Sequence, residues 1–409
     1  MRTICLALST ALALACGAGT DQPLVSDDTG VALDEVLRAA VAAGDIPGVV
    51  AVVVDRENVL YSGTAGVMDA EGAQAMQPDA IFMIASMTKP LTSLGIMMLV
   101  EEGVVSLDAP ASDYLPELED REVLVRVDAD NSSVTTRPAS RPITIRDLLR
   151  HTSGFAYTFS SPTLLEVARG TSIPSRAHPI LHDPGTRWTY GPSTAFLGWI
   201  IEEVSGQSLD EFLASRITGP LGMEDTSFDL APENRGRFVA TYRRGDAGLV
   251  GQPRPDEYQP QVRGDGGLLS TAGDYGRFVQ LILGKGARGE TRIVAESSIA
   301  EMTRDQLEGI TVVEQPAALP NTASAFPLGA GQDGFGLGFQ VTVGESVGGR
   351  PPGSLSWAGI ANTHFWIDPA NDIGVVLLLQ LFPFYDDKAI ELLTAFERTL
   401  YDGITSAEN

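Results

Sequence analysis

The strand patterns of this sequence lie at its two ends, with helical patterns between them. The β-branched run "GVVAVVVD" at 48–55 is typical of a buried strand, and "VLYSGTAG" at 59–66 is its predicted hairpin partner. Strand patterns return only late, in "GFGLGFQVTV", "GSLSWAGI", "NTHFWIDP" and "IGVVLLLQLF". Two terminal groups of strands around a helical middle predict one antiparallel sheet built from both ends of the chain, flanked by helices and carrying a helix-rich insertion.

Apolar residues at helical spacing predict helices over 33–43, 91–102, 145–151, 193–204, 209–217, 271–283 and 388–400. We therefore predict an α/β protein with a single folded domain over about 31–405. Its α/β lobe consists of about 31–80 and 285–405, and its helical lobe of about 81–284. Two stretches stand apart: 119–141 is predicted to form an exposed hairpin or flap, and 312–333 is predicted to be an irregular loop. Both are expected to shape the mouth of a binding pocket.

The first residues have the pattern of an export signal. Arg2 precedes an apolar run over 4–14, and Ala13 and Ala15 are small residues at a cleavage position, so 1–15 is predicted to be a signal peptide and 16–30 a linker. Cys16 after Ala15 also resembles a lipoprotein cleavage site, which predicts a lipid tether as an alternative to free secretion. The expected location is the periplasm, the medium or the cell envelope of a bacterium.

Composition limits the partners that this chain can have. A net charge of −25 opposes phosphate backbones and anionic membrane surfaces, so nucleic acid is not an expected partner. The two cysteines are Cys5, inside the predicted export segment, and Cys16, just at its end. The mature chain is therefore expected to have no internal disulfide and no cysteine-based metal site.

Lysine is rare in this chain, yet one lysine follows a serine by three residues. The stretch "IASMTKP" at 84–90 places Ser86 and Lys89 one helical turn apart, where the amine can contact the hydroxyl. A serine hydroxyl is a weak nucleophile until a base removes its proton, and lysine can be that base only if desolvation lowers its pKa. The apolar residues at 81–84 are the predicted source of that desolvation. Arginine stays protonated and cannot take this role. Taken alone, the pattern is also compatible with a helix-capping serine followed by a solvated lysine.

Several further motifs occur in order, and together with "IASMTKP" they resemble the serine β-lactamase and D,D-peptidase superfamily, most closely its class C β-lactamase-like esterase branch. The matching stretches are "ITIRDLLRHTSGF" at 143–155, "PGTRWTYGPSTAFLG" at 184–198, "GDGGLLSTAGDYGRF" at 264–278 and "WAGIANTHFWIDP" at 357–369. The resemblance covers about 33–400 and implies the β-lactamase/transpeptidase fold, with the active site in a cleft between two lobes.

The resemblance also implies roles for individual residues. Ser86 would be the acylated nucleophile, Lys89 its base or proton partner, and Tyr190 a second acid/base group; which of Lys89 and Tyr190 takes the first proton is left open. The backbone N–H groups of Ser86 and Ile360 would form the oxyanion hole, and Trp357 would line the acyl pocket.

Two departures from the lactamase pattern concern substrate recognition. Pro192 stands where classical members have the asparagine that binds the substrate amide, and Trp357-Ala358-Gly359 replaces the Lys-Thr-Gly whose lysine helps bind the substrate carboxylate. The predicted substrate-binding residues are therefore Trp357, Ala358, Gly359 and Pro192. The expected activity is that of a serine hydrolase on uncharged esters, as a carboxylesterase or acyl-transferase. A β-lactamase, a D,D-carboxypeptidase and a non-enzymatic envelope binding protein with the same fold remain alternatives.

Other polar residues receive structural interpretations. His151 is expected to pack in a turn, and His364 to be a packed or exposed strand residue near the site. His178 and His182 are too loosely spaced for a helical metal pair, and neither a metal nor another cofactor is expected. Asp265, which replaces one glycine of a run usually written with glycines alone, is interpreted as a turn residue bonding its own backbone.

Overall fold

The computed structural model describes residues 24–71, 73–128, 133–255 and 257–407. The signal peptide predicted for 1–15 and the lipidation site predicted at Cys16 lie outside these residues. No helix within the described ranges is both long enough and apolar enough to span a membrane.

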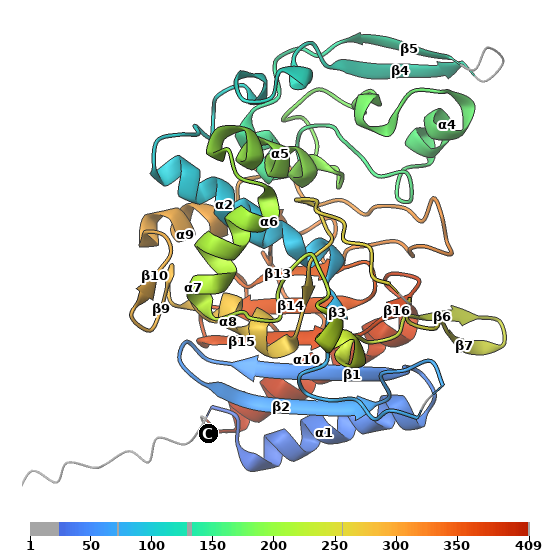
Figure 1. The fold of residues 1–409 in the computed structure, drawn as a ribbon, viewed down its shortest axis with the longest axis vertical. Coiled ribbons are helices and arrows are strands. Elements are labelled where there is room, and N and C mark those ends of the chain that lie inside the picture. The colour runs from blue at the N-terminus through green and yellow to red at the C-terminus, as the bar shows by residue number, and fades with distance from the viewer. Residues whose placement is uncertain (1–23, 72, 129–132, 256, 408–409) are drawn as a thin grey trace, which may run out of the picture.

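A seven-stranded antiparallel sheet forms the centre of the protein, and it is built from both ends of the chain as predicted (Figure 1). Its strands run in the order β11 (Gly334–Phe335), β12 (Gln340–Val341), β13 (Leu355–Gly359), β14 (Thr363–Asp368), β15 (Ile373–Leu378), β1 (Gly48–Val54) and β2 (Val59–Gly66). β1 and β2 form the predicted hairpin, with Val50 opposite Thr64. Strands from residues 48–66 therefore lie beside strands from residues 355–378.

Two of the predicted late strands are divided. The stretch 334–343 turns back on itself, with Gly338 at a φ of 103°, and forms the short hairpin β11–β12. The stretch 373–382 leaves the sheet after β15, and its end forms β16 (Leu381–Phe382), which pairs with β6 (Tyr242–Gly245). β7 (Gly248–Gly251) completes this three-stranded sheet. Strand propensity alone does not reveal such a turn, because the residues before and after the turn have the same propensity.

Burial on both faces explains the β-branched run in β1. Val50 and Val52 belong to the core between the sheet and the helical lobe, whereas Val49 and Val53 face the opposite side. There α1 (Asp27–Ala42) and α10 (Asp387–Ala407) cover the sheet. The Ser26 side chain caps α1, so residues 27–30, predicted as linker, are helical.

α8 (Ala272–Leu283) corrects the predicted boundary of the helical lobe. It falls within the stretch 81–284, but it packs on the sheet against β1 and β15. The close approach rests on a glycine of β15, because a Cβ at Gly374 would lie 2.1 Å from a side-chain carbon of Val279 on α8. Helical periodicity locates α8 in the sequence, but only the tertiary contacts assign it to the α/β lobe.

The helical lobe is built around α2. Its helices are α2 (Thr88–Glu101), α3 (Ile145–Leu149), α4 (Pro162–Gly170), α5 (Ser193–Ser205), α6 (Leu209–Leu213) and α7 (Gly219–Leu221), with α9 (Glu296–Thr303) beside α2. The helix predicted over 209–217 divides into α6 and a π-helix, Ala214–Thr218. The sequence analysis did not predict α4, α7 or α9.

Three two-stranded sheets complete the strands of the described residues. Two are hairpins, β4 (Glu122–Asp128) with β5 (Ser133–Pro138) and β9 (Ala287–Arg288) with β10 (Thr291–Arg292), and the third pairs the distant strands β3 (Phe82–Met83) and β8 (Leu269–Ser270). The first is the predicted exposed hairpin, at the far end of the helical lobe (Figure 1).

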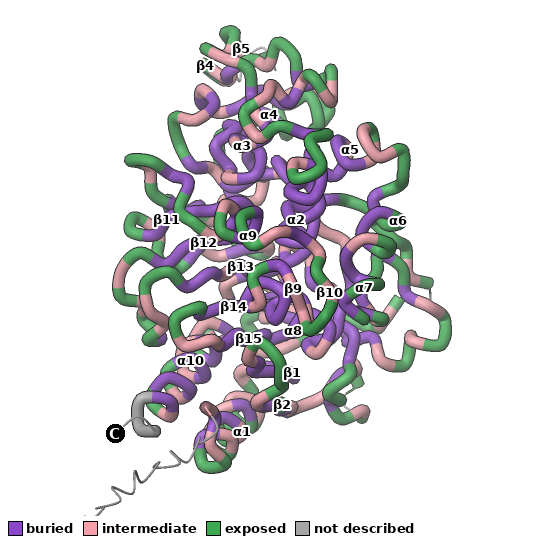
Figure 2. The backbone as a smooth tube through the Cα atoms, turned by 90° about the vertical axis from the view of Figure 1, so that its left-hand side faces the viewer, coloured by how far each residue is buried: buried purple, intermediate pink, exposed green. Residues whose placement is uncertain are grey.

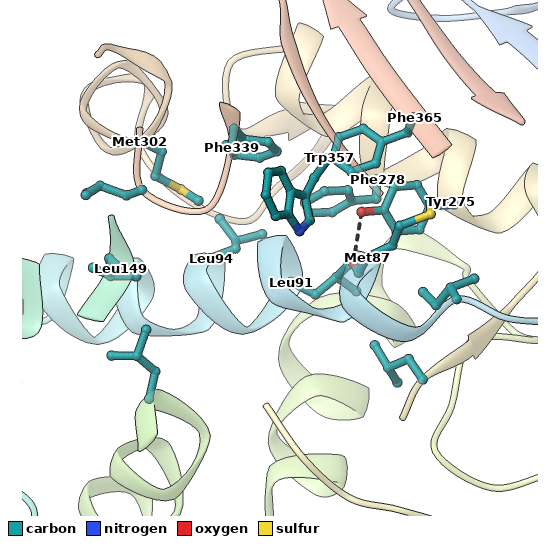
Figure 3. Close-up of a cluster of buried hydrophobic side chains, with 14 of the residues drawn as sticks. Met87, Leu91, Leu94, Leu149, Tyr275, Phe278, Met302, Phe339, Trp357 and Phe365 are labelled. Atoms are coloured by element: carbon teal, nitrogen blue, oxygen red, sulfur yellow. Dashed lines mark hydrogen bonds between the residues drawn. The ribbon is translucent and has the colours of Figure 1, made fainter. Parts of the chain in front are cut away.

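Packing of α2 against the sheet fixes the position of its first turn. Leu91 and Leu94 point from α2 towards Trp357 and the surrounding aromatic side chains (Figure 3). The Tyr275 hydroxyl donates a 2.9 Å hydrogen bond to the Met87 carbonyl oxygen, which joins α8 to the start of α2. The helix is buried along most of its length (Figure 2). Side chains on its first turn are therefore held in a rigid setting.

Candidate active site

Ser86 is presented by a tight turn between a strand and a helix. β3 ends at Met83, Ala85 has a positive φ of 45°, and Ser86 lies in a single 3₁₀ turn, Ala85–Met87, that leads into α2. A non-glycine residue in the left-handed region is strained, and such strain is concentrated at functional sites. The end of β13 lies against this turn, because a Cβ at Gly359 would be 2.2 Å from the Ile84 carbonyl oxygen. The turn thus has a constrained geometry.

Lys89 lies beneath Ser86 and is only 1% exposed. Its Nζ is 3.0 Å from Ser86 Oγ, 3.2 Å from the Tyr157 hydroxyl oxygen and 2.7 Å from the Asp265 carbonyl oxygen. The structure therefore brings the predicted pair, Ser86 and Lys89, into hydrogen-bond contact. A solvated lysine, the alternative interpretation of the motif, does not fit this burial.

The surroundings of Lys89 favour its neutral form. Burial lowers its pKa to about 7, although the charge of Asp265 raises the pKa and that of Arg263 lowers it. Rings pack against the amine: Nζ lies 4.8 Å from the centre of the Tyr190 ring and 5.3 Å from that of Tyr157. The burial predicted to come from residues 81–84 thus comes in large part from tyrosines distant in sequence.

Tyr190 lies beside the same pair of residues. It is 3% exposed, and burial raises the pKa of its hydroxyl well above the usual value, although hydrogen bonds with Ser86 and Trp357 oppose the increase. Trp357 Nε1 donates to the Tyr190 hydroxyl oxygen at 3.3 Å. Tyr190 is therefore a neutral phenol at neutral pH, suited to giving a proton.

Tyr157 is a site residue that the sequence analysis missed. Its hydroxyl contacts Lys89 and donates a 2.5 Å hydrogen bond to Asp265 Oδ2, and its ring lies 5.2 Å from that of Tyr190. Tyr157 follows the motif at 143–155 by two residues, and no spacing rule in the sequence connects it with Ser86. Only the tertiary fold brings it to the site.

The pKa of Lys89 predicts the pH dependence of catalysis. A base must be unprotonated to accept the Ser86 proton, so kcat/KM should rise as pH increases through about 7 and be half-maximal near that value. A pH profile with a neutral p-nitrophenyl ester measures this. A flat profile between pH 6 and 8 would contradict the assignment, because the substrate itself does not titrate there.

Two cavities lie near the site, and two of the predicted substrate-binding residues line the one that does not contain Ser86. A cavity of about 320 Å³ is lined by Ser86, Tyr157 and Ile360 among others. Trp357 and Ala358 line a different cavity of about 220 Å³ behind β13. Trp357 lies beside Tyr190, with ring centres 4.9 Å apart, and its role in lining the acyl pocket stays a prediction.

The position of Trp357 predicts a particular kinetic effect. Trp357→Phe removes the hydrogen bond to the Tyr190 hydroxyl, which is worth about 1 kcal/mol, so kcat should fall about fivefold with little change in KM. Steady-state kinetics on esters of two acyl lengths provide the measurement. An increase in KM that depends on acyl length, with kcat retained, would instead indicate direct contact with substrate.

The remaining predicted site residues occupy defined positions. Ile360 follows β13 and lines the cavity that contains Ser86, as a partner in the oxyanion hole must. Gly359 lies against the turn before Ser86. Pro192 is the half-buried residue at the start of α5, and a Cβ on its neighbour Gly191 would be 2.3 Å from the Phe155 carbonyl oxygen. The tyrosine motif is thus held against the 143–155 segment.

The histidines lie in structural positions. His151 is 1% exposed, with its ring 5.0 Å from that of Tyr190 and 5.4 Å from that of Phe335, and burial lowers its pKa well below the usual value. His364 on β14 lines the cavity behind β13, where burial lowers its pKa to about 3. Within the described ranges, no group of three His, Cys, Asp or Glu side chains is arranged to hold a metal ion.

A strained turn that carries a serine, a buried lysine whose pKa is lowered to about 7, and a buried tyrosine beside an antiparallel sheet define a serine hydrolase of the β-lactamase/transpeptidase fold. The chain belongs to the Beta-lactamase family, whose model matches residues 33–397. This confirms the family resemblance and the fold class.

Similar proteins include Protein Rv1367c of Mycobacterium tuberculosis, which is 34% identical over 370 residues, covering 85% of this chain and 89% of that protein. Lovastatin esterase of Penicillium rubens is 28% identical over 400 residues, covering 90% of this chain and 98% of the esterase. Among solved structures, a mutant of simvastatin synthase from Aspergillus terreus has a TM-score of 0.81 and 25% identity, covering 93% of this chain and 98% of the synthase.

Proposed function

We propose that this enzyme is a carboxylesterase or acyl-transferase that acts on uncharged esters through an acyl-enzyme on Ser86. The observation that carries the proposal is the contact between Ser86 and a buried Lys89 whose pKa is lowered to about 7. A neutral amine at hydrogen-bond distance from a serine hydroxyl is the arrangement that nucleophilic catalysis requires. The similarity to a lovastatin esterase and to a simvastatin synthase supports ester chemistry.

The pKa values of Lys89 and Tyr190 support one order of proton transfers. Lys89 takes the Ser86 proton as Oγ attacks the ester carbonyl, because its pKa is far closer to neutral than that of the buried Tyr190. The N–H groups of Ser86 and Ile360 stabilise the resulting oxyanion. Tyr190 gives its proton to the leaving alcohol and is reprotonated from Lys89. Water then releases the acid, or an alcohol forms a new ester.

The charges around the cavity support an uncharged substrate. Among its described lining residues, Arg263 and Asp265 carry charge, and they pair with each other through two hydrogen bonds of 2.9 and 2.8 Å. None of the described residues that line it offers an unpaired cation to receive a carboxylate, and Trp357 stands where the lactamase pattern has a lysine. The rings of Tyr157, Phe159 and Tyr258 provide surface for an apolar acyl or alcohol group.

Hydrolysis of p-nitrophenyl butyrate by the mature protein tests this proposal. We expect turnover with a covalent butyryl adduct on Ser86 visible in the intact mass after an acid quench, and slow or no turnover of nitrocefin. Faster nitrocefin turnover would favour a β-lactamase, and a long-lived penicillin adduct a D,D-peptidase. Inertness to all three substrates and to a fluorophosphonate probe would favour a binding protein.

We also propose that the protein is exported, with residues 1–15 removed as a signal peptide and Cys16 either lipidated or free. The support is the pattern of a charged Arg2, an apolar run and small residues before Cys16. Expression of the full chain in a bacterium, followed by fractionation and intact mass, tests the proposal. A membrane-bound form with a lipid mass that Cys16→Ser abolishes indicates a tether, and an uncleaved cytoplasmic chain contradicts export.

A further inference from the structure

The carboxylate of Asp265 is buried beside Lys89 and takes part in the hydrogen-bond network around it. Its side chain is only 2% exposed. Oδ2 accepts from the Tyr157 hydroxyl at 2.5 Å and from Arg263 at 2.8 Å, and Oδ1 accepts from Arg263 Nε at 2.9 Å. Asp265 lies in a turn, as predicted, but its side chain does not bond its own backbone: the carboxylate bridges a tyrosine and an arginine beside the candidate nucleophile.

The ionised carboxylate determines the direction of the Tyr157 hydrogen bonds. Burial by itself raises the pKa of Asp265, but the charges of Lys89 and Arg263 outweigh burial and hold it below the usual value. An ionised carboxylate only accepts hydrogen bonds, so the single hydroxyl proton of Tyr157 is directed to Oδ2. Towards Lys89, which is 3.2 Å away, Tyr157 can then only accept.

This direction decides where the lone pair of a neutral Lys89 points. A neutral amine has two N–H donors and one acceptor position, and Nζ has three oxygen neighbours. The Asp265 backbone carbonyl can only accept and takes one N–H; Tyr157, as fixed above, takes the other. The lone pair is left facing Ser86 Oγ at 3.0 Å, where it can receive the hydroxyl proton.

We propose that Asp265 is a positioning residue that holds the Tyr157 hydroxyl as an acceptor and thereby directs the Lys89 lone pair at Ser86. The inference rests on the function proposed above. Asp265 then has two separable effects. It orients the Lys89 lone pair through the Tyr157 hydroxyl, and its charge changes the pKa of Lys89 directly.

The charges of Asp265 and Arg263 shift the pKa of Lys89 in opposite directions. The titratable groups facing Lys89 are Ser86, Tyr157, Tyr190, His151 and the Arg263–Asp265 pair, and burial keeps the two tyrosines and the histidine neutral at pH 7. Asp265 raises the pKa of Lys89 and Arg263 lowers it. The rise of kcat/KM near pH 7 is the acidic limb of the pH profile. Loss of the Asp265 charge should move this limb to lower pH, and loss of the Arg263 charge should move it to higher pH.

The test measures kcat/KM for p-nitrophenyl butyrate and the rate of fluorophosphonate labelling of Ser86, both against pH. Asp265→Asn should lower kcat about tenfold and move the acidic limb down by about one pH unit. Arg263→Gln, at a half-exposed side chain that tolerates substitution, should move the limb up. In a Tyr157→Phe background, Asp265→Asn should still move the limb but lower kcat no further, because orientation through the hydroxyl is already lost.

A matched control separates these effects from simple loss of a buried ion pair. Asp386, 4% exposed and held by two hydrogen bonds from Arg244, lies outside the cavity of Ser86. Asp386→Asn should reduce the melting temperature without moving the limb. The inference is overturned if Asp265→Asn leaves the limb in place, or lowers kcat equally with and without Tyr157. If Asp265→Asn does not fold, the Arg263→Gln variant still tests the inference. An acidic limb that this variant leaves in place overturns the inference.

The same measurements distinguish failure of this inference from failure of the proposed function. A wild-type protein that neither hydrolyses the ester nor labels with fluorophosphonate contradicts the function itself. A wild-type protein that does both, with a limb that neither charge variant moves, contradicts only the role of Asp265.

Discussion

Replacing Ser86 with alanine is expected to lower the hydrolysis of p-nitrophenyl butyrate by at least about a thousandfold and to abolish the covalent butyryl adduct. The side chain that would be acylated lies on a constrained turn, 3.0 Å from the amine that would accept its proton. Loss of Oγ leaves the oxyanion donors and the binding surface in place, so a small residual rate is expected. Initial rates and intact mass at saturating substrate provide the measurement.

Ser93→Ala is the matched control for this substitution. Ser93 lies on the same helix, is 1% exposed, and its hydroxyl has no hydrogen-bond partner among the described residues. The control variant removes the same atom from α2 and should keep its activity within about twofold. Equal activity of Ser86→Ala and the wild type would remove Ser86 from the mechanism.

Lys89→Met is expected to lower kcat by about a thousandfold and to remove the acidic limb near pH 7. Methionine preserves the length and burial of the side chain but has no lone pair basic enough to take the Ser86 proton. Lys285→Met is the control, since Lys285 is exposed and pairs with Glu296 at the surface. Activity within tenfold of the wild type, with the limb retained, would show that another group is the base.

The same variant should change how stability depends on pH. Burial depresses the pKa of Lys89 from its usual value of 10.5 to about 7, so between these values the unfolded chain binds more protons than the folded one. Wild-type stability should therefore rise with pH from about 7 to about 10. Lys89→Met lacks this term, so its stability relative to the wild type should be greatest below pH 7. Urea denaturation at pH 6, 8 and 10 measures the difference.

These predictions also explain why lysine occupies position 89 in a chain whose positive charge is otherwise carried mainly by arginine. A guanidinium would remain charged in this buried site and could not accept a proton. The two other lysines, Lys285 and Lys388, are in surface pairs with Glu296 and Glu391. Where the side chain must lose its proton, arginine cannot replace it.

The sequence by itself determined the features that depend on residues close together in the chain and on the order of motifs along it. The β-branched run at 48–55 predicted a buried strand, and the order of the motifs predicted the family and the fold. The contact between Ser86 and Lys89 was predicted because three residues along a helix bring two side chains together, and the further motifs favoured a catalytic role for the pair. Patterns of this kind are visible in a sequence because their physical cause acts over a few residues.

Only the tertiary structure decided how distant residues complete the site. Tyr157 and Asp265 are separated by 108 positions, yet they meet at 2.5 Å beside Lys89. Trp357 and Tyr190 are separated by 167 positions, yet their ring centres lie 4.9 Å apart. α8 was placed in the helical lobe by its position in the chain, and it packs on the sheet. Such contacts depend on which faces of the elements pack together, and this is decided by burial over the whole core, which no local spacing records.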